Sequence, residues 1–222
     1  MLSLLDISKA PGPDNLPTIV LKNCASTLAP SITAFINSSF VNGYCLSSWK
    51  TANVCPVHKK EKKSEVENYR QISLMPILAK VQERCVLNHL FAHISSCLYD
   101  MQHGFLKGLS CTTQLLQVLH ELGQTLDSGL ETDIIYLDFS KAFDSVCHAK
   151  LLSKLRTFGI DGSLLDWFSS YLNGRQQRVV VNGSFLTWSI VKSGVPQGSI
   201  LGPVLFLMFV NDMPDVLKSS SL

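Results

Sequence analysis

The sequence predicts an α+β fold, and three patterns support this prediction. Residues 134–138 form an apolar run with β-branched and aromatic members, which is typical of a buried strand. Residues 179–186 place Asn-Gly between two apolar segments, which predicts a hairpin with a type I′ turn. Residues 77–98 carry apolar side chains at helical spacing, which predicts a long amphipathic helix.

The composition is that of a globular protein and not of a disordered one. Of 222 residues, 46% are hydrophobic and 16% are charged, which suffices for one large domain or two small ones. The net charge of +2 is too small to indicate nucleic-acid binding by itself. The N-terminus has no signal-peptide pattern, and the longest apolar run, residues 204–210, is too short to span a membrane. We therefore expect an intracellular protein, in the nucleus or the cytoplasm, with no membrane partner.

The N-terminal elements alternate between turn, helix and strand. Residues 9–17 are rich in proline and glycine, which favours a loop, and residues 16–40 favour a helix interrupted near Pro30. Residues 49–57 have strand character. The basic run at 58–63 follows directly, and such a run usually forms the solvated tip of a hairpin.

The helix expected at 77–98 raises the question of a metal site, because Cys85, His89, His93 and Cys97 recur at intervals of four. On one helix the first and last of them would lie about 18 Å apart, so all four cannot bind one ion. This spacing leaves the His89/His93 pair as the remaining candidate for a metal site. Packing on the helix is the simpler interpretation, and we expect the seven cysteines, which include no CxxC pair, to be reduced.

Three further helices are expected in the second half of the chain. Ser110 suits the N-cap of a helix with leucines at helical spacing through residue 126. Residues 164–172 predict a short helix rich in aromatic side chains. Pro203 suits the first turn of a helix that runs through residue 210.

A carboxylate stands at the end of the apolar run. Asp138 follows the expected strand, and Asp144 is suited to cap a helix that closes at Gly159. A carboxylate at the end of a buried strand requires hydrogen-bond donors or a counter-charge, and a divalent metal would supply that charge. Two interpretations of Asp138 therefore stand side by side: a cap of the next helix, and an anchor for a metal ion.

Five sequence blocks resemble one family of enzymes. The run Tyr-Leu-Asp-Phe-Ser-Lys-Ala-Phe-Asp at 136–144 and the run Gly-Val-Pro-Gln-Gly-Ser-Ile-Leu-Gly-Pro at 194–203 resemble core blocks of reverse transcriptases. The similarity is to those of non-LTR retrotransposons of the LINE type, the jockey and CR1-like group. Residues 9–15, 68–74 and 102–111 resemble three further blocks. The resemblance implies a right-hand polymerase with an antiparallel sheet and packed helices, with fingers in residues 1–130 and an incomplete palm in residues 131–222.

The resemblance also implies a chemistry, which is nucleotide addition to a DNA primer on an RNA template with deoxynucleoside triphosphates as substrates. Asp138, with the carbonyl of Phe139, would hold two Mg²⁺ ions, for which Mn²⁺ is an alternative. The amides around Lys141 and Ala142 would cradle the triphosphate. The ring of Phe143 would lie beneath the sugar and exclude a 2′-hydroxyl, although the residue alone suggests core packing.

Further contacts are implied outside the aspartate block. Arg70 and either Lys59 or Lys60 would close over the triphosphate, because a guanidinium can hold two phosphate oxygens. Gln197 would pack against nucleotide and template, and Gly198 would leave room for the base pair. The other expected contacts to nucleic acid are Lys107, Arg175 and Arg178. A solvated role is equally open for both arginines, and no protein partner follows from the sequence.

The chain departs from the family pattern at several positions. Gln71 replaces a proline, and Leu106 and Leu109 replace arginines. No Asp-Asp pair occurs in the sequence, so we expect this polypeptide to lack the second metal-binding hairpin and the thumb that the resemblance implies. We expect this polypeptide alone to be inactive, because losing such electrostatic stabilisation raises the barrier by several kcal/mol. We also expect uncovered apolar surface beside the incomplete palm.

Two other functions compete with a polymerase. A non-catalytic remnant of a retrotransposon would bind nucleic acid without performing chemistry. A different two-metal enzyme of phosphoryl transfer, such as a nuclease, is disfavoured because no further cluster of carboxylates occurs in the sequence.

Overall fold

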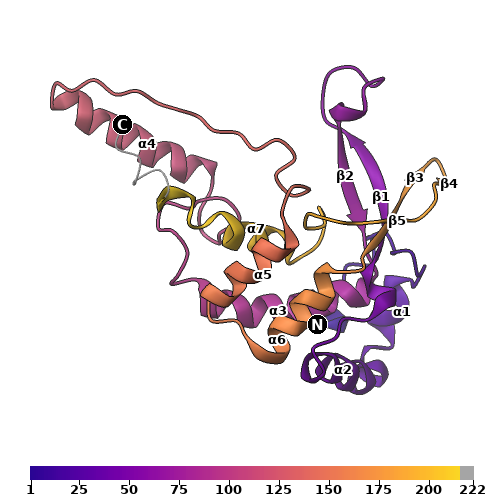
Figure 1. The fold of residues 1–222 in the computed structure, drawn as a ribbon. Helices are drawn as coiled ribbons and strands as arrows, with labels where there is room; N and C mark the ends of the chain where they lie inside the picture. Colours follow the sequence, from indigo (N-terminus) through magenta and orange to yellow (C-terminus); the bar gives the residue numbers. More distant parts are fainter. Residues whose placement is uncertain (216–222) are drawn as a thin grey trace.

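Helices form most of the regular structure, and the computed structural model describes residues 1–215. The helices in chain order are η1 (Leu2–Leu4), α1 (Thr18–Asn23), α2 (Ala25–Val41), η2 (Ser47–Lys50), η3 (Val66–Asn68), α3 (Ile77–Ile94), α4 (Cys111–Asp127), α5 (His148–Thr157), α6 (Gly162–Leu172) and α7 (Gly202–Val210). The strands are β1 (Thr51–His58), β2 (Tyr69–Leu74), β3 (Gln176–Val181), β4 (Ser184–Phe185) and β5 (Ser189–Ile190). This combination fits the predicted α+β class (Figure 1).

The sheet is mixed, whereas the sequence suggested an antiparallel one. Its strands lie in the order β2-β1-β3-β4, and β5 pairs with β3. β1 and β2 form an antiparallel hairpin whose register pairs His58 with Tyr69, and Figure 1 shows this hairpin standing clear of the helices. β1 and β3 run parallel, with Val54 beside Val179, because the helical segment between them returns the chain in the same direction.

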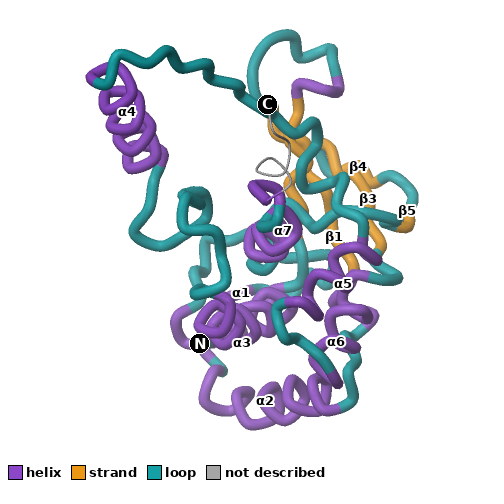
Figure 2. Tube along the Cα trace, turned by 60° about the vertical axis from the view of Figure 1, so that its left-hand side comes forward, coloured by secondary structure: helices purple, strands orange, loops and turns teal. Residues whose placement is uncertain are grey.

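The main core lies between α3, α5, α6 and α7, which Figure 2 shows gathered beside the sheet. Its largest fully buried side chains include Trp167, Phe168, Leu155 and Met208. Each buried side chain of this size contributes about 1.5–3 kcal/mol through the hydrophobic effect. Val195 and Leu201, in the segment before α7, belong to this core and anchor that loop on it.

Three local predictions are confirmed. Asn182 and Gly183 have positive φ angles of 50° and 79°, and β3 pairs antiparallel with β4 across them, as a type I′ hairpin requires. Ser110 caps α4 in a capping box with Thr113. Pro203 lies in the first turn of α7.

The first helical region breaks at a different place from the one expected. Cys24 separates α1 from α2, and Pro30 lies inside α2. Ile36 of α2 packs with Leu2 and Val81 in a second, smaller core, and this packing holds the helix together through the proline. Within residues 1–215, no helix has both the length and the apolar character that crossing a membrane would require.

The helix after the aspartate block also begins later than expected. α5 starts at His148 with Cys147 as its N-cap residue, so the prediction that Asp144 caps this helix is wrong. Asp144 lies in a turn, where its N–H donates to the carbonyl of Lys141 at 2.9 Å. The loop at Gly194 contacts this turn before the helix begins.

The apolar run at 134–138 forms no strand, which corrects the prediction. Residues 131–139 have neither strand nor helix structure, and Tyr136 is 84% exposed. A strand needs a neighbour to pair its backbone groups, and none of the described strands runs beside this segment. The preceding helix α4 likewise exposes Leu119 and Leu126, and Figure 1 shows both segments extending away from the other helices. Apolar side chains are thus exposed on α4 and in residues 134–137, while the uncovered surface expected beside an incomplete palm and the division into fingers and palm stay predictions.

Candidate functional site

A cavity of about 580 Å³ brings together residues that are far apart in the sequence. The hairpin of β1 and β2 contributes Arg70, the aspartate block contributes Asp138, and the loop before α7 contributes Gln197. The full lining is Lys59, Val66, Glu67, Tyr69, Arg70, Gln71, residues 138–144 and Gln197. We call this space the Asp138 cavity.

The loop at Gly194 holds the aspartate block in place. The N–H of Gly194 donates to the carbonyl of Val146 at 2.7 Å, and the N–H of Val195 donates to that of Phe143 at 2.8 Å. Gly194 has a φ of 88°, and a Cβ there would lie 2.8 Å from the Cα of Asp144. Only glycine permits this approach, because the left-handed conformation and the contact both exclude a side chain.

At Gln197 and Gly198, the loop before α7 is joined to β2, which contributes another wall of the Asp138 cavity. The N–H of Ser73 donates to the carbonyl of Gln197 at 2.7 Å. Gly198 has a φ of 117°, and a Cβ there would lie 2.7 Å from the carbonyl oxygen of Ser73. A glycine is therefore needed at position 198, because the loop packs closely against the backbone of β2 there. Because Arg70 lies on the same strand, its position and that of Gln197 are coupled.

Phe143 both packs and lines the cavity. Its half-buried ring stacks on Phe206, with centroids 5.2 Å apart and an angle of 20° between the planes. Phe105 meets it edge-on at 5.9 Å. The ring of Phe139 contacts the same Phe206 ring, with centroids 6.2 Å apart. Phe206 therefore holds the cavity residues on both sides of the turn at 140–142 in place.

The cavity combines positive and negative side chains in exposed positions. Its cations are Lys59, Arg70 and Lys141, and its carboxylates are Glu67, Asp138 and Asp144. Within the described part of the chain, none of these three cations forms a salt bridge. Their charge is available to an anionic ligand. Lys141 also has a φ of 52°, an uncommon conformation for a residue with a side chain.

The remaining predicted site residues lie outside this lining. Lys60 pairs with Glu61 at 3.6 Å near the hairpin tip, so Lys59 is the lysine that reaches the cavity. Lys107 is exposed in the loop between α3 and α4. Arg178 donates to Oδ1 of Asn53 at 2.8 Å, and its guanidinium lies over the rings of Phe185 and Trp188.

Arg175 requires a correction. Its side chain is only 2% exposed, so it cannot reach a nucleic-acid backbone from this position. One guanidinium nitrogen donates to the carbonyl of Tyr171 at 3.2 Å, and the other contacts the sulfur of Met75 at 3.1 Å. Arg175 lies between the end of α6 at Leu172 and the start of β3 at Gln176, and it is buried where the sequence suggested a surface position.

Sequence reasoning missed one buried carboxylate beside the Gln197 loop. Glu83 of α3 is 1% exposed. Its carboxylate accepts hydrogen bonds from the Tyr171 hydroxyl at 2.9 Å and from the N–H of Ile200 at 2.6 Å. Burial raises the pKa of Glu83, while the nearby Arg175 charge and the hydrogen bonds oppose that rise. The available signal was a charged residue at i, i+3, i+7 spacing with Val86 and Leu90.

The donors in the Asp138 cavity suit a hard cation. Asp138 offers a carboxylate and Phe139 a backbone carbonyl, and oxygen ligands of this kind bind Mg²⁺. Among residues 1–215, no three His, Cys, Asp or Glu side chains form a group that could hold a metal by themselves.

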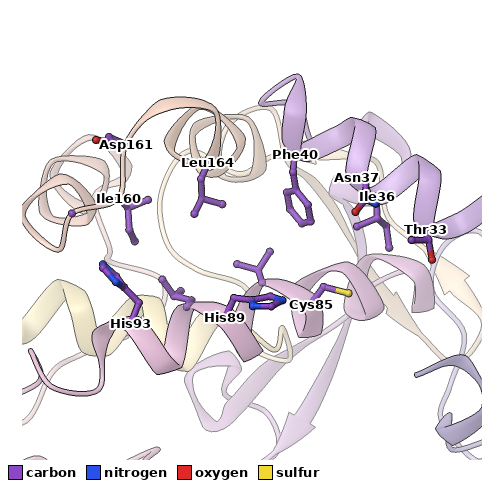
Figure 3. Close-up of a pocket in the computed structure, with 13 residues that line it drawn as sticks. Thr33, Ile36, Asn37, Phe40, Cys85, His89, His93, Ile160, Asp161 and Leu164 are labelled. Atoms are coloured by element: carbon purple, nitrogen blue, oxygen red, sulfur yellow. The ribbon is translucent and has the colours of Figure 1, made fainter.

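The His89/His93 pair lies in a separate pocket of about 610 Å³ between α2, α3 and α6 (Figure 3). Nε2 of His93 donates to the carbonyl of Phe158 at 2.8 Å, which occupies that nitrogen. The opposite wall carries Phe40 and Leu164 beside the polar Thr33, Asn37 and Asp161, and within residues 1–215 no three metal-ligating side chains are grouped here. This environment supports the packing interpretation over a metal site.

Comparisons with known proteins give a consistent result. Residues 57–221 match the family described as Reverse transcriptase (RNA-dependent DNA polymerase). The chain is 32% identical over 213 residues to the probable RNA-directed DNA polymerase from transposon BS of Drosophila melanogaster, a match covering 95% of this chain and 23% of that protein. It is 31% identical over 217 residues to the RNA-directed DNA polymerase from mobile element jockey of the same species, covering 96% and 24%. The chain thus spans about a quarter of the length of the curated relatives it matches.

Proposed function

Because the chain belongs to the reverse transcriptase (RNA-dependent DNA polymerase) family, we propose that its Asp138 cavity binds the incoming deoxynucleoside triphosphate. The observation that supports this is the common lining of one cavity by Asp138, Arg70 and Gln197. They come from three separate sequence blocks, and a cleft that combines cations with a carboxylate suits a metal-bound triphosphate. In the whole protein, the fingers and part of the palm would be supplied by this chain.

The residues of the cavity have distinct roles in the proposed reaction. The primer 3′-hydroxyl attacks the α-phosphate, and pyrophosphate leaves. Two Mg²⁺ ions, when bound, neutralise charge on the attacking and leaving oxygens. Asp138 and the Phe139 carbonyl would hold them. Lys59 and Arg70 would bind the triphosphate oxygens and orient the α-phosphate.

The aspartate turn would bind the rest of the nucleotide. Amides around Lys141 and Ala142 would donate to the triphosphate tail, because the turn leaves these groups at the cavity wall. The Phe143 ring, held by its stack on Phe206, would exclude a 2′-hydroxyl and so select deoxynucleotides. Template RNA and a DNA primer would be the other partners.

We propose further that this polypeptide retains nucleotide binding but does not perform nucleotide addition. The sequence contains no Asp-Asp pair, which is the second set of metal-binding carboxylates that the family resemblance implies for a two-metal site. Binding depends mainly on Lys59, Arg70 and Asp138, all of which line the cavity. The chain alone would bind a triphosphate in the presence of Mg²⁺ and would not extend a primer.

The proposal is tested by measuring binding of a fluorescent deoxynucleoside triphosphate with and without Mg²⁺. Arg70→Ala should weaken binding about tenfold to a hundredfold, because hydrogen bonds between charged groups contribute about 1.5–3 kcal/mol. Asp138→Asn should remove the dependence on Mg²⁺. Asp133→Asn is the matched control, since this exposed aspartate lies in the same segment outside the lining. Equal Mg²⁺-dependent binding by Asp138→Asn and by the unchanged chain would overturn the assignment.

A primer-extension assay on an RNA template separates the proposed family role from the alternative of a non-catalytic remnant. Extension that disappears in Asp138→Ala would show that the chain has the complete activity, and our separation of binding from addition would then be wrong. Retention of template without triphosphate binding would favour the remnant.

A further inference from the structure

One face of the hairpin formed by β3, β4 and β5 carries side chains that the proposed mechanism does not use. Phe185 pairs with Val180, and Ile190 pairs with Gln176. Paired residues of an antiparallel ladder share a face, and so do alternate residues of one strand. Phe185 and Ile190 therefore project on the same side of the hairpin as Arg178. The pairing gathers an aromatic ring, an aliphatic side chain and a guanidinium on one surface.

Arg178 holds two aromatic rings in place on this face. Its guanidinium carbon lies 4.2 Å from the ring centroid of Phe185 and 4.5 Å from that of Trp188. Phe185 is nevertheless 56% exposed, Trp188 41% and Ile190 67%. We call these four residues the hairpin platform. Rings that a cation already holds lose little freedom when a flat ligand stacks on them, so less of the binding energy is spent on ordering them.

The guanidinium of Arg178 also keeps hydrogen-bond donors free. Its Nε donates to Oδ1 of Asn53 at 2.8 Å. Among residues 1–215, neither terminal nitrogen of this side chain has a hydrogen-bond or salt-bridge partner. A guanidinium with free N–H groups suits an anion with several oxygen acceptors, such as a phosphate.

The sheet that carries the platform contains no carboxylate. No Asp or Glu occurs in residues 15–60, 69–74 or 167–211, and these ranges include all five described strands. Lys192 closely follows β5, is exposed, and forms no salt bridge within the described part of the chain. Its charge and that of Arg178 are therefore unopposed within the sheet, and this imbalance favours a polyanion as the ligand.

The platform lies at the edge of the sheet opposite the Asp138 cavity. The strand order is β2-β1-β3-β4, and β2 at one edge supplies Tyr69, Arg70 and Gln71 to that cavity. β4 carries Phe185 at the other edge (Figure 1). The platform is therefore a surface of its own, outside the proposed triphosphate site.

From these observations we propose that the hairpin platform binds single-stranded RNA outside the polymerase cavity. Unpaired bases stack on Phe185 and Trp188, with Ile190 extending the apolar surface, and the cations contact phosphates. Every base has a flat face, so a platform of this kind binds RNA without sequence preference. RNA commonly presents unpaired bases to proteins. This RNA site does not depend on triphosphate binding in the Asp138 cavity, and both can be occupied together.

The test titrates the chain with a single-stranded RNA decamer of mixed sequence and follows the fluorescence of Trp188. A base that stacks on the indole should quench its emission. Phe185→Ala should weaken the binding measured in this way about fivefold to a hundredfold, because it removes one stacking surface. Phe35→Ala is the matched control, since Phe35 is 52% exposed on α2, outside the sheet, and it should leave the affinity unchanged. Thermal unfolding verifies that each variant is folded.

Two further variants separate stacking from charge. Trp188→Phe should abolish the quench but keep the affinity, measured by anisotropy of a labelled decamer, within about twofold, because phenylalanine can still stack. Arg178→Gln should weaken binding and reduce the slope of log K against log salt by about 0.7, because it removes one phosphate contact. An unchanged salt slope in Arg178→Gln would contradict the phosphate contact.

The state of the RNA and the independence of the two sites complete the test. Double-stranded RNA of the same sequence should not quench Trp188, because its bases stack on one another, and equal quenching by the duplex would overturn the proposal. Arg70→Ala should keep the quench, and Phe185→Ala should keep triphosphate binding, so that failure of one site is told apart from failure of the other. RNA that leaves Trp188 emission unchanged would also overturn the proposal and would favour a protein partner for this face.

Discussion

The carboxylate of Glu83 accepts a hydrogen bond from the backbone N–H of Ile200, with 2.6 Å between Oε2 and N. The same oxygen accepts from the N–H of Leu201 at 3.3 Å, and Oε1 accepts from the Tyr171 hydroxyl. One side chain of α3 therefore satisfies the backbone at the entrance of α7 and links it to α6. This contact holds the C-terminal side of the loop whose other side carries Gln197 into the Asp138 cavity.

Replacement of Glu83 should therefore destabilise the chain and displace the loop. Glu83→Ala leaves two backbone N–H groups unpaired and the buried Arg175 without its nearby carboxylate, and we expect a loss of about 3–5 kcal/mol in the free energy of unfolding. Glu83→Gln keeps one acceptor at nearly the same volume and should lose less. Urea unfolding followed by circular dichroism measures both changes. A loss below about 1 kcal/mol in Glu83→Ala would contradict the role of this carboxylate.

Gly12 provides a second prediction, with a matched control in the same chain. A Cβ at Gly12 would lie 2.4 Å from the backbone nitrogen of Pro76, so the loop at 9–17 could no longer rest on the segment between β2 and α3. We expect Gly12→Ala to destabilise the chain by about 3 kcal/mol, since neither backbone can move easily. Gly123 lies inside α4 with nothing within 4 Å of an added Cβ, so Gly123→Ala should stabilise that helix by about 0.5–1 kcal/mol. Unfolding midpoints of the two variants that shift in the same direction would refute this reasoning.

Features set by a few adjacent residues were predictable from the sequence. The turn at Asn182, the cap at Ser110 and the proline at the start of α7 each depend on local backbone preferences. The common cavity of Asp138, Arg70 and Gln197 joins three distant blocks, and only the family resemblance suggested that they meet. Family membership is confirmed by the match over residues 57–221, while the roles of these residues stay proposals.

Features set by distant neighbours were not predictable. Residues 134–138 have every local property of a strand, but strand formation needs a pairing partner, and none of the described strands supplies one. The charged side chains of Glu83 and Arg175 are buried because α3, α6 and the Gln197 loop converge on them. Helical periodicity places Glu83 on the apolar face. It does not reveal which hydrogen-bond donors from other elements surround the carboxylate there.

Cys45 should differ sharply from the exposed cysteines in reactivity. It is 2% exposed, and burial raises the pKa of its thiol to about 11. At about pH 8 only about one molecule in a thousand would carry the reactive thiolate, so iodoacetamide should not modify Cys45 in the folded chain. The exposed cysteines are Cys24, Cys97, Cys111 and Cys147. Peptide mass spectrometry before and after unfolding in urea makes the comparison, and early labelling of Cys45 would show that this core is open.

The ion pair between Lys154 of α5 and Asp212 after α7 should make part of the stability depend on pH. The hydrogen bond from Lys154 is the main cause that lowers the pKa of Asp212 below its ordinary value of 3.8. The stabilisation is therefore present above about pH 4 and is lost as the pH falls through the pKa of the folded state. Because Asp212 is 63% exposed, solvent screens the pair, and Asp212→Asn should cost at most about 1 kcal/mol at neutral pH. The difference in unfolding free energy between Asp212→Asn and the unchanged chain should shrink towards zero below about pH 3; a difference that grows on acidification would rule out this pair as its source.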